Sequence, residues 1–286
     1  MEWTSLIIFT VIAQVAVGLV LVYWLLGFTA GAKEQAPAYA AFAKPVLLGA
    51  WILTGIAAAI SATHLGWPLS AYRALSHLAS SWLSREALLE LLFGALALAM
   101  WAMVQWGAKA LTHWWYAGLA AVGILATYSS GMIYTLPSIP ANHNWFPVAL
   151  FGATVLVTGG AALLTLLHAT KSGRQLADGL GKSLALFTLY SLVLSAVLTV
   201  TYASAAKSGT PEARQQAAQL MGTALYPVRV IVGLLIPAGL AAWLARNART
   251  AMAAVAVLAL VILAGEMAGR WLFFTSTVFT GINSGL

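Results

Sequence analysis

Ten ionisable side chains gather on one proposed side of the membrane, the outer side, at or near the ends of long apolar runs, and their types are suited to acid–base chemistry and ligand binding. A charge placed in or beside a membrane segment is costly unless it is paired or hydrated, so such a group is a functional candidate by default. The alternative is mutual pairing and side chains that reach to the membrane surface. The ten are His64, Arg73, His77, Arg85, Glu86, Glu90, His143, Arg229, Glu266 and Arg270.

His64 and Glu86 are the strongest candidates for acid–base chemistry. His64 ends the second apolar run just before the turn Leu65-Gly66-Trp67-Pro68, and Glu86 opens the third run. An imidazole and a carboxylate at one end of neighbouring helices can accept protons from a substrate hydroxyl. A structural interpretation remains open: Ser84 could cap the third helix, with Glu86 near its positive end.

Three further charges lie in the last two runs. Glu266 and Arg270 are four residues apart, so the spacing predicts an ion pair within one helix. Arg229 follows Tyr226-Pro227 and has no nearby acid in the sequence. It therefore needs a partner from another helix, such as Glu266, or a ligand.

The elements that must position these residues are transmembrane helices. Of the 286 residues 62% are hydrophobic and 7% charged, and the mean hydropathy is +0.90. A bilayer core of about 30 Å needs about 20 apolar residues per helix. The sequence predicts an all-α fold with a single transmembrane domain over 1–286 and eight spans, near residues 5–28, 44–63, 87–108, 114–134, 147–168, 183–205, 221–245 and 250–275.

The basic residues predict how the spans are oriented. With an outer N-terminus, the inner loops carry eight basic residues against two acidic ones, whereas the outer side carries six against five. Positively charged loops stay in the cytoplasm, so both termini are expected outside, in the periplasm. The inner charges are Lys33, Lys44, Lys109, Lys171, Arg174, Lys182, Arg246 and Arg249, with Glu34 and Asp178.

The net charge and the lack of cysteine exclude several functions. The formal charge of +7 is scattered without a basic run, which favours contact with lipid head groups rather than nucleic acid. The sequence has no cysteine, so the protein cannot hold a Cys-ligated iron–sulfur cluster or zinc site.

Several segments resemble the DmsC-type membrane anchor subunits of dimethyl sulfoxide reductases and related molybdoenzymes. The resemblance covers nearly the whole sequence and rests mainly on His64-Leu65-Gly66-Trp67-Pro68, on Leu83-Ser84-Arg85-Glu86 and on Ala264-Gly265-Glu266 with Gly269-Arg270. The sequence departs from the pattern at Phe274, where tyrosine is common, and in the segment 140–147, where tryptophan comes later than usual.

The resemblance implies a multi-pass anchor in the bacterial inner membrane. Such a subunit oxidises menaquinol without haem or an iron–sulfur cluster of its own, near the periplasmic face. It passes electrons to a ferredoxin-like iron–sulfur subunit and on to a molybdopterin catalytic subunit, so it performs quinol oxidation but not the terminal reduction. By resemblance His64 and Glu86 are the catalytic pair, Arg73 and Arg85 help to bind quinol, and Arg229, Glu266 and Arg270 support the site.

Two other functions stay open from the residues alone. A cytochrome b-type anchor would ligate haem through facing histidines, for which His113 and His168 are the candidates, although both lie at the ends of runs. A secondary transporter would place its charges near the midplane on broken helices. The charges here favour one face, and no matched pair of broken segments is apparent.

Overall fold

The protein folds into a bundle of long helices. The computed structural model describes residues 2–63, 68–107, 111–247 and 252–280. Eight helical stretches among these residues are long and apolar enough to cross a membrane, which confirms the predicted all-α fold and the eight spans. They are α1 (Glu2–Leu26), α3 (Ala36–Ala62), α4 (Trp82–Trp106), α5 (His113–Ile133), α6 (Phe146–Ala169), α7 (Lys171–Lys207), the composite of α9 (Leu225–Val230), η2 (Ile231–Leu235) and α10 (Ile236–Arg246), and α11 (Met252–Thr275).

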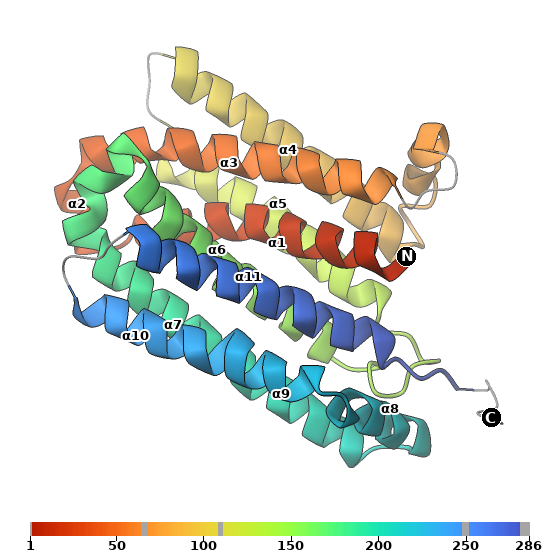
Figure 1. Ribbon diagram of the computed structural model, residues 1–286. Helices are drawn as coiled ribbons and strands as arrows, with labels where there is room; N and C mark the ends of the chain where they lie inside the picture. The colour runs from red at the N-terminus through yellow and green to blue at the C-terminus, as the bar shows by residue number, and fades with distance from the viewer. Residues whose placement is uncertain (1, 64–67, 108–110, 248–251, 281–286) are drawn as a thin grey trace.

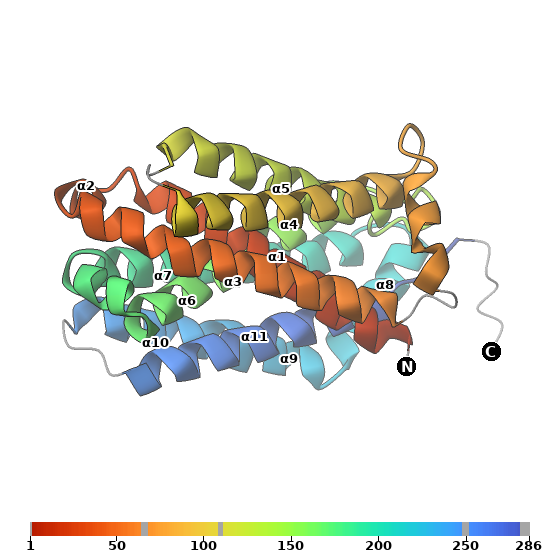
Figure 2. The same ribbon diagram turned by 90° about the horizontal axis from the view of Figure 1, so that it is seen from above.

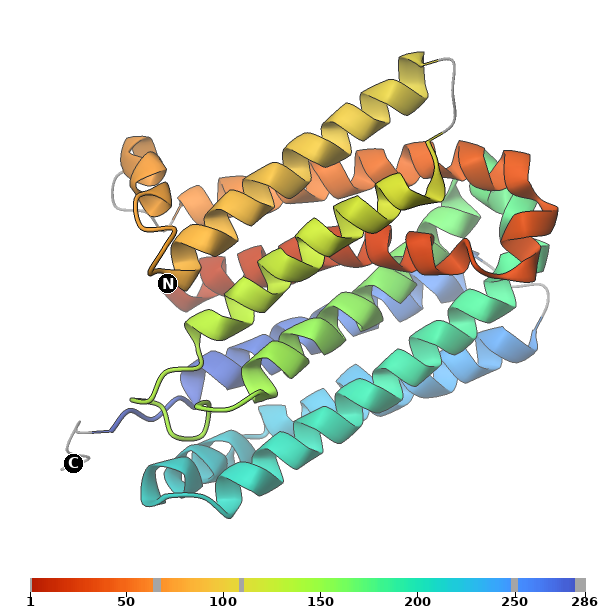
Figure 3. The same ribbon diagram turned by 180° about the vertical axis from the view of Figure 1, so that it is seen from behind.

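The start of α1 and the end of α11 lie at the same end of the bundle, as Figures 1 and 3 show from two sides. We call this the terminal end. The short helix α2 (Ala30–Glu34) lies at the opposite end, and the helix α8 (Pro211–Gly222) lies at the terminal end. Which end faces the periplasm stays a prediction from the loop charges.

Helices α1 and α6 form the centre of the bundle, with α3, α4 and α5 on one side and α7, α10 and α11 on the other (Figure 2). They touch at Gly18 and Gly159. A Cβ added to Gly18 would lie 2.3 Å from the Val155 carbonyl oxygen, and one added to Gly159 would lie 2.6 Å from the Gly18 Cα. Small residues let helix backbones approach closely in a membrane, where apolar burial alone gives little preference for protein over lipid.

The observed boundaries differ from the predicted ones where polar residues continue a helix. Helix α7 begins at Lys171, twelve residues before the predicted span, because Thr170 caps it by accepting a hydrogen bond from the Gly173 amide at 3.0 Å. The first turns of α7 are too polar for hydropathy to assign them to the membrane span. Helix α3 likewise begins at Ala36 and runs through Pro45.

The seventh span is a continuous helix that contains a π-helical turn. It passes through the π-helical turn η2 between α9 and α10, and Gly233 in this turn packs against Gly265 of α11. Such turns are often found at functional sites. Here the turn follows directly after Arg229.

Candidate functional site

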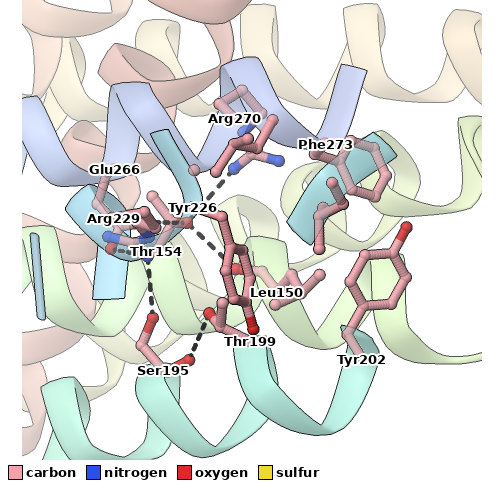
Figure 4. Close-up of a pocket in the computed structure, with 13 residues that line it drawn as sticks. Leu150, Thr154, Ser195, Thr199, Tyr202, Tyr226, Arg229, Glu266, Arg270 and Phe273 are labelled. Atoms are coloured by element: carbon pink, nitrogen blue, oxygen red, sulfur yellow. Dashed lines mark hydrogen bonds and ion pairs between the residues drawn. The ribbon is translucent and has the colours of Figure 1, made fainter. Parts of the chain in front are cut away.

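A buried ion pair joins α9 to α11 in the half of the bundle nearer the terminal end. Arg229 Nη2 lies 2.8 Å from Glu266 Oε1, and each residue is only 4% exposed. Thr154 Oγ1 of α6 donates to Glu266 Oε2 at 2.7 Å, and Arg229 Nη2 also donates to Ser195 Oγ of α7 at 3.2 Å. Figure 4 shows these groups converging from four helices. Arg229 therefore has the interhelical partner that the sequence requires.

Arg270 does not form the local pair predicted from its spacing to Glu266. Its Nη2 donates instead to Gln14 Oε1 of α1 at 2.6 Å and to Thr154 Oγ1 at 3.4 Å. Its guanidinium carbon lies 3.5 Å from the centre of the Phe151 ring. The predicted local ion pair is not formed because Glu266 faces Arg229 and Arg270 faces α1, and Thr154 is hydrogen-bonded to both Glu266 and Arg270.

Two glycines explain the spacing of the Gly265-Glu266-x-x-Gly269-Arg270 segment. A Cβ on Gly269 would lie 2.7 Å from Arg229 Nε, and one on Gly265 would lie 2.5 Å from the Gly233 Cα. Gly265 lets the η2 turn approach α11, and Gly269 leaves room for the guanidinium. The two glycines thus let Arg229 come close enough to α11 to pair with Glu266.

Glu86 and Glu90 bring the network to α4. Glu86 is 4% exposed, lies in hydrogen-bonding range of Ser130 on α5, and interacts electrostatically with Arg270. Glu90, one turn further along α4, interacts with Glu86 and lines a small cavity with Gln14. The cation beside Glu86 is therefore Arg270 of α11.

The remaining predicted site residues lie in or near the segment between α3 and α4. Arg85 donates to the carbonyls of Leu78 at 2.9 Å and Ala79 at 2.6 Å, and its guanidinium lies 4.2 Å from the Trp82 ring centre. It thereby holds the loop before α4. Arg73 is exposed in the 3₁₀ helix η1 (Pro68–Leu75), and His64 lies outside the described residues.

The capping residue of α4 also differs from the predicted one. Ser81 accepts from the Ser84 amide at 3.4 Å, so Ser81 is the cap and Ser84 is already helical. With Ser81 as the cap, Glu86 lies about one turn inside α4. Glu86 is therefore buried among helices rather than placed at an exposed helix end.

A second polar cluster stabilises the terminal end. Tyr202 of α7 donates to Asn142 Oδ1 at 2.6 Å, and Gln216 of α8 donates to the Tyr202 oxygen at 2.6 Å. Gln216 Oε1 then accepts from the Val278 amide at 3.2 Å. Segments distant in sequence are thus joined beside the site. Nearby, burial raises the pKa of the Tyr134 hydroxyl, and Glu86 raises it further.

The cavities near the ion pair are water-sized. One of about 50 Å³ is bordered by Arg229, Glu266 and Tyr226, and it has room for a few waters (Figure 4). A much larger cavity of about 660 Å³ lies toward the opposite end, between α6, α7, α10 and α11. Its charged and polar lining is His168, Asp178, Lys182, Arg246 and Asn247.

The two histidines considered for haem have different surroundings. His113 packs against aromatic rings, with its centroid 4.5 Å from Phe28 and 5.7 Å from Trp24. His168 lines the large cavity, and its Nδ1 is 3.0 Å from the Leu164 carbonyl oxygen. Within the described residues no group of three or more His, Asp and Glu side chains is placed to hold a metal ion.

Comparison with known proteins identifies the family. The family model described as DMSO reductase anchor subunit (DmsC) matches residues 1–276. This protein belongs to that family. It is 29% identical over 278 residues to the YnfH protein of the anaerobic dimethyl sulfoxide reductases of Escherichia coli strain K12, and the match covers 96% of this sequence and 94% of that protein.

Two further relatives give the same assignment. The C subunit of the anaerobic dimethyl sulfoxide reductase of the same E. coli strain is 29% identical over 285 residues, with 96% of this sequence and 94% of that protein covered. Its Haemophilus influenzae counterpart is 31% identical over 156 residues, 54% of each protein. The protein is therefore a multi-pass membrane anchor of the DMSO reductase family, and an anchor implies catalytic and electron-transfer partners.

Sequence reasoning missed the neutral members of the network. Gln14, Ser130, Thr154 and Ser195 each lie inside an apolar run and are buried. A polar side chain that faces lipid is costly, so such residues signal an interior position. The signal shows which residues face inward, but it does not show which partners they meet.

Proposed function

We propose that this protein anchors a DMSO-reductase-type molybdoenzyme in the bacterial inner membrane and oxidises menaquinol at its terminal end. Electrons pass from there to a ferredoxin-like iron–sulfur subunit and then to a molybdopterin subunit that reduces the terminal acceptor. Family membership supports the anchor role. The observation that carries the quinol role is the burial of Glu86 beside Arg270, because a carboxylate hidden at that depth favours a functional interpretation.

The chemistry requires two proton acceptors. Menaquinol releases two electrons and two protons when it becomes menaquinone. In the proposed site Glu86 takes a proton from one ring hydroxyl, and the neighbouring Arg270 stabilises the carboxylate before the transfer. His64 serves as the acceptor for the second hydroxyl, as the resemblance implies. Both termini and the quinol site are on the periplasmic side in this proposal.

The arginines have supporting roles in this proposal. Arg85 holds the loop before α4 through the Leu78 and Ala79 carbonyls, which keeps that segment in place beside Glu86. Arg73 is exposed and can meet the quinol or a partner subunit. Glu266, which is paired with Arg229, fixes Thr154, and Thr154 in turn contacts Arg270.

Menaquinol is the only redox-active ligand that we assign to this protein, as a bound substrate. Without cysteine it cannot ligate an iron–sulfur cluster, so the electrons must leave through a partner that has one. We assign no haem to the histidines, because His113 is packed among aromatic rings.

The test compares two electron donors in the membrane-bound complex. Glu86→Gln and His64→Ala should each lower menaquinol-dependent turnover by about 10² to 10⁴, the range for a lost acid–base group. Turnover with an artificial donor that reduces the partner subunits directly should stay at the wild-type level. The matched control is Glu34→Gln, an exposed glutamate at the opposite end, which should leave both activities unchanged. Wild-type menaquinol turnover in both site variants would refute the proposal.

One observation favours a second location for the quinol. The cavity of about 660 Å³ near the opposite end has the volume of a typical ligand pocket and is lined by His168 and Asp178. If quinol reacted there, His168→Ala or Asp178→Asn would abolish menaquinol turnover and Glu86→Gln would not. The family resemblance and the buried carboxylates favour the terminal end.

A further inference from the structure

A small cavity lies one helical turn inside Glu86. It measures about 10 Å³ and is formed by α1, α4 and α5. Its polar lining consists of Glu90, Gln14, Thr10, Thr127 and Ser130. The quinol chemistry described above does not use Glu90, although a carboxylate inside a membrane needs a partner or a proton.

The hydrogen bonding of Gln14 indicates that this cavity contains an ordered water. The residue is 3% exposed, and its Oε1 must face Arg270, because the guanidinium only donates hydrogen bonds. Its Nε2 is thereby directed elsewhere, and it is buried without a hydrogen-bond partner. A buried N–H of this kind usually bonds to an ordered water, and the cavity has room for roughly one.

Ser130 connects this cavity to Glu86. Its hydroxyl lies in hydrogen-bonding range of the Glu86 carboxylate, and the same residue lines the cavity that contains Glu90. A serine hydroxyl both donates and accepts and can rotate between partners. Ser130 and one water can therefore bridge the two carboxylates.

The charges around the pair differ between its two members. Arg270 of α11 interacts directly with Glu86, whereas the neutral amide of Gln14 lies between Arg270 and the Glu90 cavity. The residues that α1 and α5 present to this cavity have no charge. A buried carboxylate beside a cation gives up a proton more readily than one without a cation, so a proton that reaches Glu86 passes favourably to Glu90.

We propose that Glu90, with one water held by Gln14, is an internal proton-accepting site for the quinol reaction assigned above to Glu86. The inference rests on that proposed function. When menaquinol is oxidised, its two electrons go to the iron–sulfur partner and Glu86 receives one proton. That proton moves through Ser130 and the water to Glu90, which regenerates the Glu86 carboxylate for a further transfer. Each transfer breaks one O–H bond and forms another, with no other reactant.

The first measurement is the infrared difference spectrum between the quinol-reduced and oxidised complex in membranes. The carbonyl stretch of a protonated carboxylic acid should change on reduction, and Glu90→Gln should remove that band. Glu90→Asp should shift the band and retain it. Glu212→Gln, on α8, is the matched control and should leave the band as it is. A band that survives unchanged in Glu90→Gln overturns the proposal.

The second measurement is menaquinol-dependent turnover in water and in deuterium oxide. Glu90→Gln should lower turnover by roughly 10²-fold, increase the solvent isotope effect and alter the pH profile, while artificial-donor turnover remains at the wild-type level. Ser130→Ala should have the same direction of effect. If Glu90 had only a structural role, Glu90→Gln would lower both activities and leave the isotope effect unchanged. That result would overturn the proposal.

The two proposals fail in different ways. If Glu86→Gln lowers menaquinol turnover while Glu90→Gln keeps wild-type turnover and isotope effect, the quinol site stands and the internal site is refuted. If Glu86→Gln and His64→Ala both keep wild-type turnover, the quinol site itself is refuted, and the relay with it.

Discussion

At the scale of single residues, the site is a set of buried charges whose partners come from distant parts of the sequence. Arg229 pairs with Glu266, and Arg270 reaches Gln14, 256 positions away. Removing one member of a buried pair leaves an unpaired charge, whereas removing both leaves none. Loss of Glu266 is therefore expected to destabilise the protein, whereas loss of Glu86 or Glu90 is expected to lower menaquinol turnover alone.

Glu266→Gln should destabilise the subunit by about 3–5 kcal/mol, because it leaves Arg229 buried without its counter-charge. Thermal unfolding of the purified complex in detergent should show a lowered Tm, and both activities should fall together. The double variant Arg229→Met with Glu266→Met should recover much of the lost stability. If Glu266→Gln unfolds like the wild type and loses only menaquinol turnover, Glu266 belongs to the reaction and not to the scaffold.

The sequence indicated which residues are charged and near helix ends, but not how they pair. Spacing of four residues predicts a local pair for Glu266 and Arg270, and that prediction fails because Gly265 and Gly269 bring the η2 turn and Arg229 against α11. Local periodicity cannot reveal that a residue from another helix, here Arg229, competes for Glu266. Gln14 and Thr154 were missed for the same reason.

At the scale of elements, helix number follows from hydropathy, but helix ends and helix contacts do not. The eight spans are long apolar runs, which a window of about 20 residues detects. The first turns of α7 and the whole of α8 are polar, so their formation depends on caps such as Thr170 and Thr210. The contact between α1 and α6 depends on two glycines that composition alone does not distinguish from the others.

Gly159→Ala should weaken the packing of α1 on α6, since its Cβ would lie 2.6 Å from the Gly18 Cα. Overpacking of this kind costs about 1–3 kcal/mol. Gly152→Ala on the same helix is the matched control, because a Cβ there meets nothing within 4 Å. The difference in Tm between the two variants measures the effect. Equal stability would show that the two helices are not in close contact.

At the scale of the whole molecule, the bundle has two chemically different ends. The terminal end has the network of Glu86, Arg229, Glu266 and Arg270, and the opposite end has most of the loop basic residues. Positive loops predict that the opposite end faces the cytoplasm. The terminal end would then face the periplasm, where we propose that the partner subunits bind.

Reporter fusions test this orientation. Fusions after Lys109 and Lys171 should report the cytoplasm, and fusions after Pro211 and at Leu286 should report the periplasm, because the loop charges favour that arrangement. The inverted pattern would place Glu86 at the cytoplasmic face and would require the electron-transfer partner to bind there.

The central claim is that menaquinol binds at the terminal end beside Glu86, and photo-crosslinking tests it most directly. A photoreactive menaquinol analogue should label peptides from η1 and the start of α4 when the complex is digested and mapped by mass spectrometry. Unlabelled menaquinol should compete, and Glu86→Gln should reduce the labelling. Competable labelling confined to residues 164–189 and 242–247, which border the large cavity at the opposite end, would contradict the account.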